Sequence, residues 1–184
     1  MNCLGTQTLE TKRLILRKIK AEDYKQMYEN WACREECSRF FPWSAATDIE
    51  VYKNRVLTWV DSYKDDFYFN WLIELKEPKE AIGIINLHDV DTEQESAETS
   101  YIVAPEHWGK GLMTEALRCV LRYAFEALEL NRVGADVFEG NVASEKVLEK
   151  CGFQREGIAK EKYEKDGMYF DATLYGAFRK EEQA

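Results

Sequence analysis

Apolar and polar residues alternate around Leu14 and Leu16, and this period of two is typical of a half-buried strand. Other short apolar stretches, bounded by turn residues, are predicted as further strands. The full set is 10–19, 67–76, 81–90, 96–105, 132–138, 153–162 and 168–179. The last two are joined at Lys165-Asp166-Gly167, and Asp-Gly is a hairpin signal because Gly accepts a positive φ.

Four other stretches carry apolar residues every three to four positions, which indicates amphipathic helices. They are 21–35, a segment starting after Asp48, a long segment from Gly111 to about Leu130, and 141–153. Asp48 and Asn141 are suitable N-caps, and Gly152 stands just past the end of the last helix.

The order of these elements predicts the fold class. The early strands follow one another as hairpins, whereas the later ones are separated by helices. We therefore expect an α/β (α+β) fold, with a mixed, mainly antiparallel twisted sheet and helices on both faces. No repeat or linker interrupts the chain, so a single domain over residues 1–184 is expected.

Composition excludes several classes of protein. The formal net charge of −9 argues against nucleic-acid binding, which needs a basic surface. No run approaches the roughly 18 apolar residues that cross a membrane, and the first residues lack a signal peptide. The five cysteines form no CxxC pair, so neither a disulfide framework nor a metal site is indicated. A cytoplasmic protein is expected.

The stretch HWGKGLMTEALR (107–118) is the strongest candidate for chemistry. A helix start leaves backbone N–H groups unpaired, and these donors, with the helix dipole, favour an anion. Gly109 and Gly111 allow close approach to the main chain, and Lys110 adds a positive charge. The stretch could therefore hold phosphate, although a plain turn would need the same glycines.

Other phosphate motifs fit this stretch poorly. A P-loop requires GxxxxGK[ST], and that spacing does not occur. A dinucleotide fold requires a third glycine where Thr114 stands. The loop alone therefore leaves both the phosphate site and the plain turn open.

Several ordered motifs together resemble the GNAT superfamily of acetyl-coenzyme A dependent N-acetyltransferases. They are TKRLILR, AETSYIVAPEHWGKGLMTEAL, ELNRVGADV, NVASEKVLEKCGFQREG and DGMYFD, which together span most of the chain. Trp108 and Met113 depart from the family's pyrophosphate signature, in which Gln or Arg and Gly or Ala are usual. The Trp is typical of a branch resembling the ribosomal-protein N-terminal alanine or serine acetyltransferases.

The resemblance implies a set of residues that bind acetyl-CoA. Pantetheine would pair with the backbone of Tyr101, Ile102 and Val103, as an added strand does. Asn141 would bond the cofactor arm, besides capping its helix, and Ser144 lies one turn into that helix. The pyrophosphate would lie against the loop residues Trp108, Gly109, Lys110, Gly111, Leu112, Met113 and Thr114.

Acyl transfer needs a neutral amine and a proton for the departing thiolate. By resemblance, Ser144 would protonate the thiolate, and Glu98 would act as base directly or through water. A structural role is the alternative for both. Some relatives carry a base on the late segment, where Tyr163 stands here. Asp171 matches a late Asp and is expected to be structural.

Three other groups have simpler interpretations. Cys119 and Cys151 lie on apolar helical faces, which favours buried thiols over nucleophiles. His107 is expected to be a solvated loop residue. Aromatic residues are expected mostly in the core, and those in 38–43 are candidates for the acceptor site.

The sequence therefore predicts direct transfer of an acetyl group from acetyl-CoA to a primary amine, without a metal. The acceptor is either a protein N-terminus, including that of a ribosomal protein, or a small amine such as a polyamine, amino acid or drug. A CoA-binding sensor without turnover and a nucleotide-phosphate binding protein are the alternatives. The oligomeric state is open, with a homodimer among the options.

Overall fold

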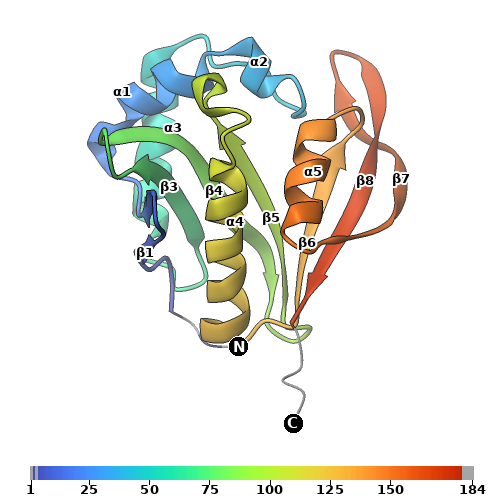
Figure 1. Ribbon diagram of the computed structural model, residues 1–184. Helices are drawn as coiled ribbons and strands as arrows, with labels where there is room; N and C mark the ends of the chain where they lie inside the picture. Colours follow the sequence, from blue (N-terminus) through green and yellow to red (C-terminus); the bar gives the residue numbers. More distant parts are fainter. Residues whose placement is uncertain (1, 3, 180–184) are drawn as a thin grey trace.

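The computed structural model describes residue 2 and residues 4–179, and an eight-stranded sheet forms its centre (Figure 1). The sheet order is β1-β2-β3-β4-β5-β6-β8-β7, and every neighbouring pair is antiparallel except β5 and β6, which are parallel. The strands are β1 (Leu9–Glu10), β2 (Leu14–Arg17), β3 (Phe69–Leu75), β4 (Glu80–Asp91), β5 (Ser96–Val103), β6 (Arg132–Phe138), β7 (Gln154–Lys165) and β8 (Met168–Phe178). The predicted mixed, mainly antiparallel fold is confirmed.

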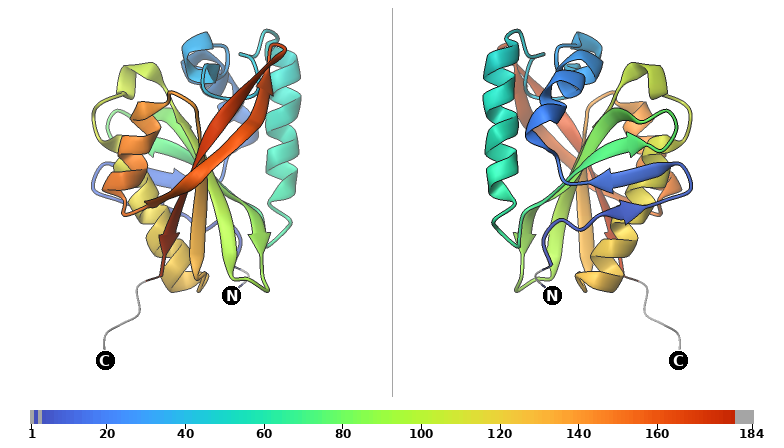
Figure 2. Two further views of the ribbon diagram at one scale, coloured as in Figure 1. Left: turned by 90° about the vertical axis from the view of Figure 1, so that its right-hand side faces the viewer. Right: turned by 90° about the vertical axis from the view of Figure 1, so that its left-hand side faces the viewer.

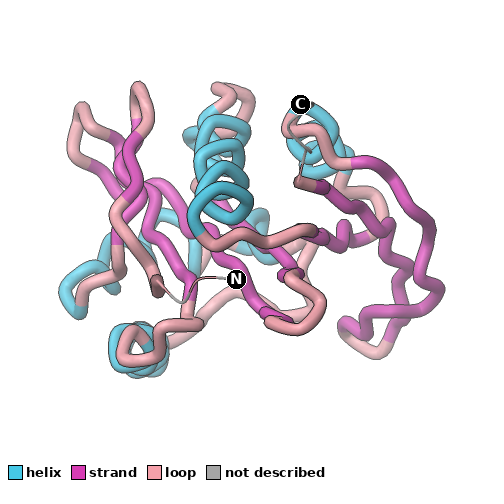
Figure 3. Tube along the Cα trace, turned by 90° about the horizontal axis from the view of Figure 1, so that it is seen from below, coloured by secondary structure: helices cyan, strands magenta, loops and turns pink. Residues whose placement is uncertain are grey.

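Helices cover both faces of the sheet (Figures 2 and 3). The α-helices are α1 (Tyr24–Met27), α2 (Glu35–Ser38), α3 (Ile49–Ser62), α4 (Leu112–Arg122) and α5 (Val142–Lys150). The 3-10 turns are η1 (Ala21–Asp23) and η3 (Pro105–His107), and the π turns are η2 (Tyr28–Ala32) and η4 (Tyr123–Ala127). α4 and α5 lie on one face, and α1 and α3 lie on the other (Figure 2).

Each face carries its own hydrophobic cluster. On the α4 face, Ala116, Leu117 and Val120 are fully buried against strand residues such as Trp71 and Ile85. The opposite cluster joins α1 and α3 to the sheet through residues that include Met27, Trp31, Val56, Leu72 and Ile102. The two clusters hold the helices against the two faces of the sheet. β5 is one of the central strands between them.

The predicted strand over 10–19 is wrong in one respect, because the segment is a short hairpin. The Thr11 backbone N–H donates to the Leu14 carbonyl at 3.0 Å, and the Thr11 hydroxyl accepts from the Leu14 N–H at 2.9 Å. These bonds turn the chain between β1 and β2. Alternation alone does not reveal such a turn, because no Gly or Pro marks it.

The predicted helix over 21–35 is continuous from Ala21 to Ala32 but changes its helical type and ends earlier than expected. It contains η1, α1 and the π turn η2, and Arg34 then adopts an extended conformation (φ −95°, ψ 118°) before α2. The Ala46 N–H donates to the Ala32 carbonyl at 2.7 Å, so the chain after α2 folds back onto the end of η2. This tertiary contact is invisible to helical periodicity.

The predicted end of the long helix lies close to the observed one, and the predicted last hairpin turn is confirmed. The helix predicted to reach Leu130 passes through η4 and ends at Leu128, because Glu129 is left-handed with φ 60°. Asp166 and Gly167 have φ 53° and 78°, as the predicted hairpin turn between β7 and β8 requires. Within residues 2 and 4–179, no helix is long and apolar enough to cross a membrane.

Asp48 provides a test of the predicted helix start. Its carboxylate accepts from the N–H groups of Glu50 at 2.8 Å and Val51 at 3.2 Å, so it caps α3. We expect Asp48→Ala to lower the free energy of unfolding by about 1 kcal/mol, measured by urea denaturation. Asp48→Asn is the matched control, since Asn caps as well as Asp. Equal stability of the Ala variant and the native chain would contradict this role.

Candidate active site

The glycine loop between η3 and α4 has the backbone geometry that phosphate binding requires. Gly109 and Gly111 both have φ 72°, a left-handed conformation that other residues rarely adopt. A Cβ at Gly109 would meet nothing within 4 Å, so the main chain is open on that side. The first bond of α4 runs from the Glu115 N–H to the Gly111 carbonyl, which leaves the preceding amides without intrahelical partners.

The outer side of the loop is braced by the N-terminal hairpin. The Arg13 guanidinium donates to the Lys110 carbonyl at 3.0 Å and to the Glu115 carboxylate at 2.6 Å. Thr11 also donates to Glu115 at 2.6 Å. These bonds lower the pKa of the Glu115 carboxyl against the opposing effect of burial. The loop is therefore held in place before any ligand arrives. No local pattern in the sequence indicates this role for Arg13.

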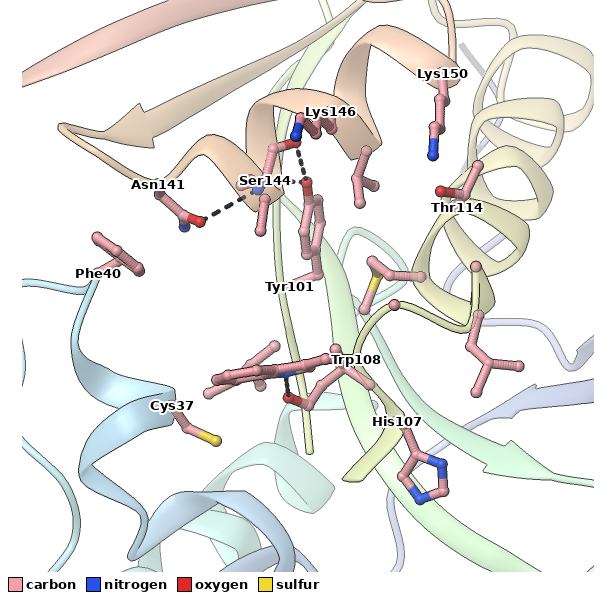
Figure 4. A pocket seen from close by; sticks show the side chains of 18 of the residues that line it. Cys37, Phe40, Tyr101, His107, Trp108, Thr114, Asn141, Ser144, Lys146 and Lys150 are labelled. Carbon is pink, nitrogen blue, oxygen red and sulfur yellow. Dashed lines mark hydrogen bonds between the residues drawn. The ribbon is translucent and has the colours of Figure 1, made fainter. Parts of the chain in front are cut away.

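A cavity of about 360 Å³ lies between the loop, α4, β5 and α5 (Figure 4). Of the predicted cofactor residues it is lined by Tyr101, Ile102, Val103, Trp108, Gly109, Gly111, Leu112, Met113, Thr114, Asn141 and Ser144. Lys110 lies outside the lining and contributes its carbonyl to the brace instead. The Met113 side chain is only 6% exposed and belongs to the core under α4.

The positive charge in this cavity comes from α5. Lys146 and Lys150 line it, and Figure 4 shows Lys150 pointing across toward Thr114 of α4. Sequence reasoning missed both lysines, because they sit on the polar face of a helix in which charge is ordinary. Their position opposite the loop suits an anionic group, which would lie between the two helices.

β5 separates from β6 beside this cavity. The parallel pairing covers only Ser96, Ala97 and Glu98 of β5. The Ala104 N–H donates to the Ile82 carbonyl at 2.7 Å, so the main-chain groups of Ile102 also face β4. By the same alternation, the main-chain groups of Tyr101 and Val103 face the gap. Ile102, expected to pair with pantetheine, is therefore committed to the β4 ladder.

Trp108 covers part of the free edge of β5. Its indole N–H donates to the Val103 carbonyl at 2.8 Å, and its side chain is 49% exposed (Figure 4). The indole therefore already satisfies one of the acceptors at the gap. The Tyr101 main-chain groups and the Val103 N–H remain directed toward the gap.

Two hydroxyl groups meet at the start of α5. Tyr101 Oη lies 2.9 Å from Ser144 Oγ, and the Asn141 side chain accepts from the Ser144 N–H at 3.2 Å (Figure 4). Burial raises the pKa of Tyr101, with Ser144 opposing this, so the phenol stays protonated and can donate to Ser144. The Ser144 hydroxyl hydrogen is then free to point into the cavity. Sequence analysis assigned Tyr101 only a backbone role.

Glu98 lies on the other face of the sheet from Tyr101, because three residues separate them along one strand. It sits beside Gly134 of β6, where an added Cβ would lie 2.1 Å from Glu98 Oε1. Burial, and then the nearby Asp136 carboxylate, raise the pKa of Glu98. The predicted acid, Ser144, and the predicted base, Glu98, therefore lie on opposite faces of the sheet, beside the gap between β5 and β6.

Aromatic side chains from the loop after α2 reach the same region. Phe40 and Phe41 line the cavity, and Phe40 packs against Phe138 with ring centroids 6.5 Å apart. Trp43 stacks on Phe41 at 4.3 Å and is 49% exposed, so it is not a core residue. The expectation that loop 38–43 lies near the site agrees with this placement.

The remaining candidates make contacts within the fold, and His107 also lines the cavity. His107 is buried, with Nε2 3.4 Å from Glu80 Oε1, so its expected solvation is wrong. Asp171 binds the Lys160 ammonium at 2.6 Å and the Glu161 N–H at 3.0 Å. Tyr163 stacks on Phe138 at 5.6 Å.

Cys119 and Cys151 are poor nucleophiles. Burial raises the pKa of the Cys151 thiol to about 11 and also raises that of Cys119, so both stay protonated. Cys3 lies outside the described residues. No group of His, Cys, Asp or Glu suited to a metal ion occurs within residues 2 and 4–179.

Several known proteins are similar to this chain in sequence. The model of the acetyltransferase (GNAT) domain matches residues 13–154. The uncharacterized N-acetyltransferase YoaA of Bacillus subtilis is 34% identical over 95% of this chain and 98% of its own. Spermidine N(1)-acetyltransferase of Vibrio cholerae is 34% identical over 86% of this chain and 89% of its own.

The fold also matches a solved structure. The ribosomal-protein-S5-alanine acetyltransferase of Vibrio fischeri superposes with a TM-score of 0.83 and 24% identity, over 94% of this chain and 97% of its own. This likeness shows the fold. The family match over most of the sequence and the similarity to YoaA show an acetyl-CoA dependent N-acetyltransferase: the chain belongs to the GNAT acetyltransferase family.

Proposed function

We propose that this chain transfers the acetyl group directly to a primary amine, with Ser144 and Glu98 acting from opposite sides of the gap between β5 and β6. The observation that carries the proposal is the separation of these strands beyond Glu98 and Gly134. It exposes a strand edge beside an open glycine loop, and a ligand bearing both amides and phosphates needs that combination.

The residues around the cavity fit acetyl-CoA. The loop amides and the α4 N-terminus suit the pyrophosphate, and Lys146 and Lys150 add positive charge from α5. The edge of β5 at Tyr101 and Val103 suits the amides of the pantetheine arm. Acetyl-CoA supplies the activated acetyl thioester, which the protein then has only to orient.

Ser144 is the proposed proton donor to the departing sulfur. Tyr101 Oη lies 2.9 Å from Ser144 Oγ, and in this proposal the phenol donates, which leaves the Ser144 hydrogen for the departing sulfur. Asn141 holds the first turn of α5 and therefore fixes the position of Ser144. Tyr101 and Asn141 are positioning residues in this scheme.

Glu98 is the proposed base for the acceptor amine, directly or through water. Its raised pKa, caused by burial and Asp136, makes its carboxylate a better proton acceptor than an exposed one. An amine that enters from the α3 face meets Glu98 first and the gap next. The neutral amine can then attack the carbonyl carbon from the side opposite the cofactor cavity.

Two acceptor classes follow from the relatives. The similarity to a spermidine acetyltransferase suggests a polyamine acceptor. The likeness to a ribosomal-protein-S5-alanine acetyltransferase suggests the N-terminus of a protein. The proposal is tested by thiol release from acetyl-CoA with a panel of amines and N-terminal peptides. Amine-dependent thiol release supports it. Thiol release that no amine accelerates, with acetyl-CoA still bound, contradicts it.

Gly111 offers a test of the pyrophosphate cradle. Asn and Asp both tolerate the left-handed conformation at this position and have nearly equal shapes, so the pair isolates charge. We expect Gly111→Asp to weaken CoA binding, measured calorimetrically, by about tenfold or more relative to Gly111→Asn, because like charges repel. Equal affinities of the two variants would remove the loop from the proposed site.

Ser144 offers a test of the proton donor. We expect Ser144→Ala to lower kcat about a hundredfold while leaving the Kd for acetyl-CoA nearly unchanged, since the donor acts mainly in the transition state. Ser144→Thr is the control, because it keeps the hydroxyl. If Ser144→Ala turns over normally, Ser144 has only a structural role.

Glu98 offers a test by pH. Because its pKa is raised, kcat/KM should fall on the acid side at a pH above the ordinary range of a Glu, as the carboxylate becomes protonated. We expect Glu98→Gln to lower kcat/KM and to remove this acid limb from the profile.

The same shift affects stability independently of catalysis. Burial favours neutral Glu98 in the folded state, so its stabilising contribution is present at low pH and is lost as the pH rises through the raised pKa. If Glu98→Gln removes that dependence but leaves the rate profile intact, Glu98 is structural.

A further inference from the structure

The middle of β7 carries a bulge opposite β8. The register of the two strands shifts between Ala159 and Tyr163, so that residues 160–162 of β7 stand opposite the single residue Asp171 of β8. Extra residues of this kind disrupt the ladder locally and re-aim the side chains beside them. The bulge is therefore a place where the sequence departs from regular strand geometry for the sake of a side chain.

Asp171 holds this bulge by two bonds. Its Oδ1 accepts from the Glu161 N–H at 3.0 Å, and its Oδ2 binds the Lys160 ammonium at 2.6 Å. Glu161 has φ 49°, a left-handed conformation that residues other than glycine rarely adopt. Such a conformation persists only where the surroundings hold it, and the Asp171 carboxylate supplies the acceptor for the strained main chain.

The bulge changes the direction of Lys162. Neighbouring residues of a regular strand point to opposite faces of the sheet. Tyr163 stacks on Phe138 of β6, with ring centroids 5.6 Å apart. Lys162 reaches the same face, because its ammonium bonds to Asp136, which lies two residues before Phe138 on β6. In a regular strand Lys162 would point away from Asp136.

The ion pair of Lys162 and Asp136 lies beside Glu98. The Glu98 carboxylate lies over Gly134 of β6, where an added Cβ would be 2.1 Å from Glu98 Oε1. Asp136 follows two residues after Gly134, on the same face. The side chains of Lys162 and Asp136 are 38% and 22% exposed, so solvent screens their charges only in part. Glu98 therefore experiences the charge of Asp136 and its neutralisation by Lys162.

The charged groups that face Glu98 come from β4, β6 and β7. Burial, and then the Asp136 carboxylate, raise the pKa of Glu98. The groups that lower this pKa are Arg132 of β6, His88 of β4 and Lys162 of β7. The protonation of Glu98 thus depends on a balance between one carboxylate and several basic groups.

Within this balance, Lys162 has a distinct position. Arg132 and His88 each bond to another carboxylate, at 2.6 Å and 2.9 Å. Lys162 bonds to Asp136, the carboxylate that repels Glu98. Tyr163 also faces Asp136, but burial, and then Asp136, raise the pKa of its phenol to about 12, so it stays neutral. The charge that offsets Asp136 therefore comes from Lys162.

We propose that Asp171 is a positioning residue: it holds the bulge of β7 that aims the Lys162 ammonium at Asp136, beside Glu98. Lys162 in this position offsets the negative charge that Asp136 places next to the proposed base. The consequence for catalysis rests on the proposed role of Glu98. The charge arrangement itself can be measured on the free protein, without acetyl-CoA or an acceptor.

The first test follows the Glu98 carboxyl group by 13C NMR during a pH titration of the full chain. Its signal is assigned by its loss in Glu98→Gln. We expect Lys162→Met to raise the pKa of Glu98 by about half a unit or more, because Asp136 is then no longer neutralised. Asp136→Asn should shift the pKa in the opposite direction. An unchanged pKa of Glu98 in Lys162→Met would overturn the proposal.

Variants of Asp171 connect the bulge to this effect. Asp171→Ala should raise the pKa of Glu98 as Lys162→Met does, and the double variant should raise it no further, because both changes act through one contact. Asp171→Asn keeps an oxygen for the Glu161 N–H and should titrate like the native chain.

Lys160→Met is the matched control for the loss of a positive charge. Lys160 is 76% exposed and bonds to Asp171 instead of Asp136, so its removal should leave the pKa of Glu98 in place. A native pKa in Asp171→Ala, or a further rise in the double variant, would show that Asp171 does not act through Lys162.

The kinetic profile separates this proposal from the base role of Glu98. The acid limb of kcat/KM is measured with the best acceptor of the amine panel. If the limb moves to higher pH with the Glu98 pKa in Lys162→Met and Asp171→Ala, both proposals are supported. If the pKa moves and the limb does not, the positioning by Asp171 stands and Glu98 is not the base. If Glu98→Gln removes the limb but neither of the other variants moves it, the base role stands and the positioning role is wrong.

Discussion

The short stretch over which β5 and β6 pair is the constraint on which the rest of the site depends. The two strands pair only through Ser96–Glu98 and Arg132–Gly134, and the lack of a side chain at Gly134 leaves room for the Glu98 carboxylate. Beyond that point the Tyr101 and Val103 main chain faces open space. The glycine loop and the start of α5 then flank one opening, the cavity into which the proposed cofactor residues face.

Much of the fold could be predicted because its elements carry local signals. α4 keeps a three-four apolar spacing, Asp48 and Asn141 cap their helices, and Asp166-Gly167 turns the last hairpin. The errors arose where distant parts of the chain decide local conformation. The helix predicted over 21–35 ends where residues near Ala46 bond back to Ala32, and periodicity within one segment contains no information about such contacts.

The site divides in the same way. Gly109, Gly111 and Asn141 were predicted because their backbone roles depend on residue type and on short spacings. Arg13 holds the loop from about a hundred positions away, and Lys150 comes beside α4 only in the folded chain, where Arg118 donates to its carbonyl at 2.6 Å. Asn70 Oδ1 is buried without a hydrogen-bond partner, and this depends on which neighbours bond to the other polar atoms of Asn70. Such facts arise from three-dimensional neighbourhoods and require coordinates.

The hydrogen bond between Trp108 and Val103 has a consequence for solubility. A strand edge with unpaired main-chain groups is a template for strands of other molecules, and proteins commonly cover or interrupt such edges. If this edge binds the pantetheine arm as proposed, it has to stay accessible and cannot be covered by another strand. A half-exposed indole that occupies one carbonyl, with α5 standing alongside, shields the edge from a foreign strand. The residue that departs from the family signature thus helps to keep an open sheet from aggregating.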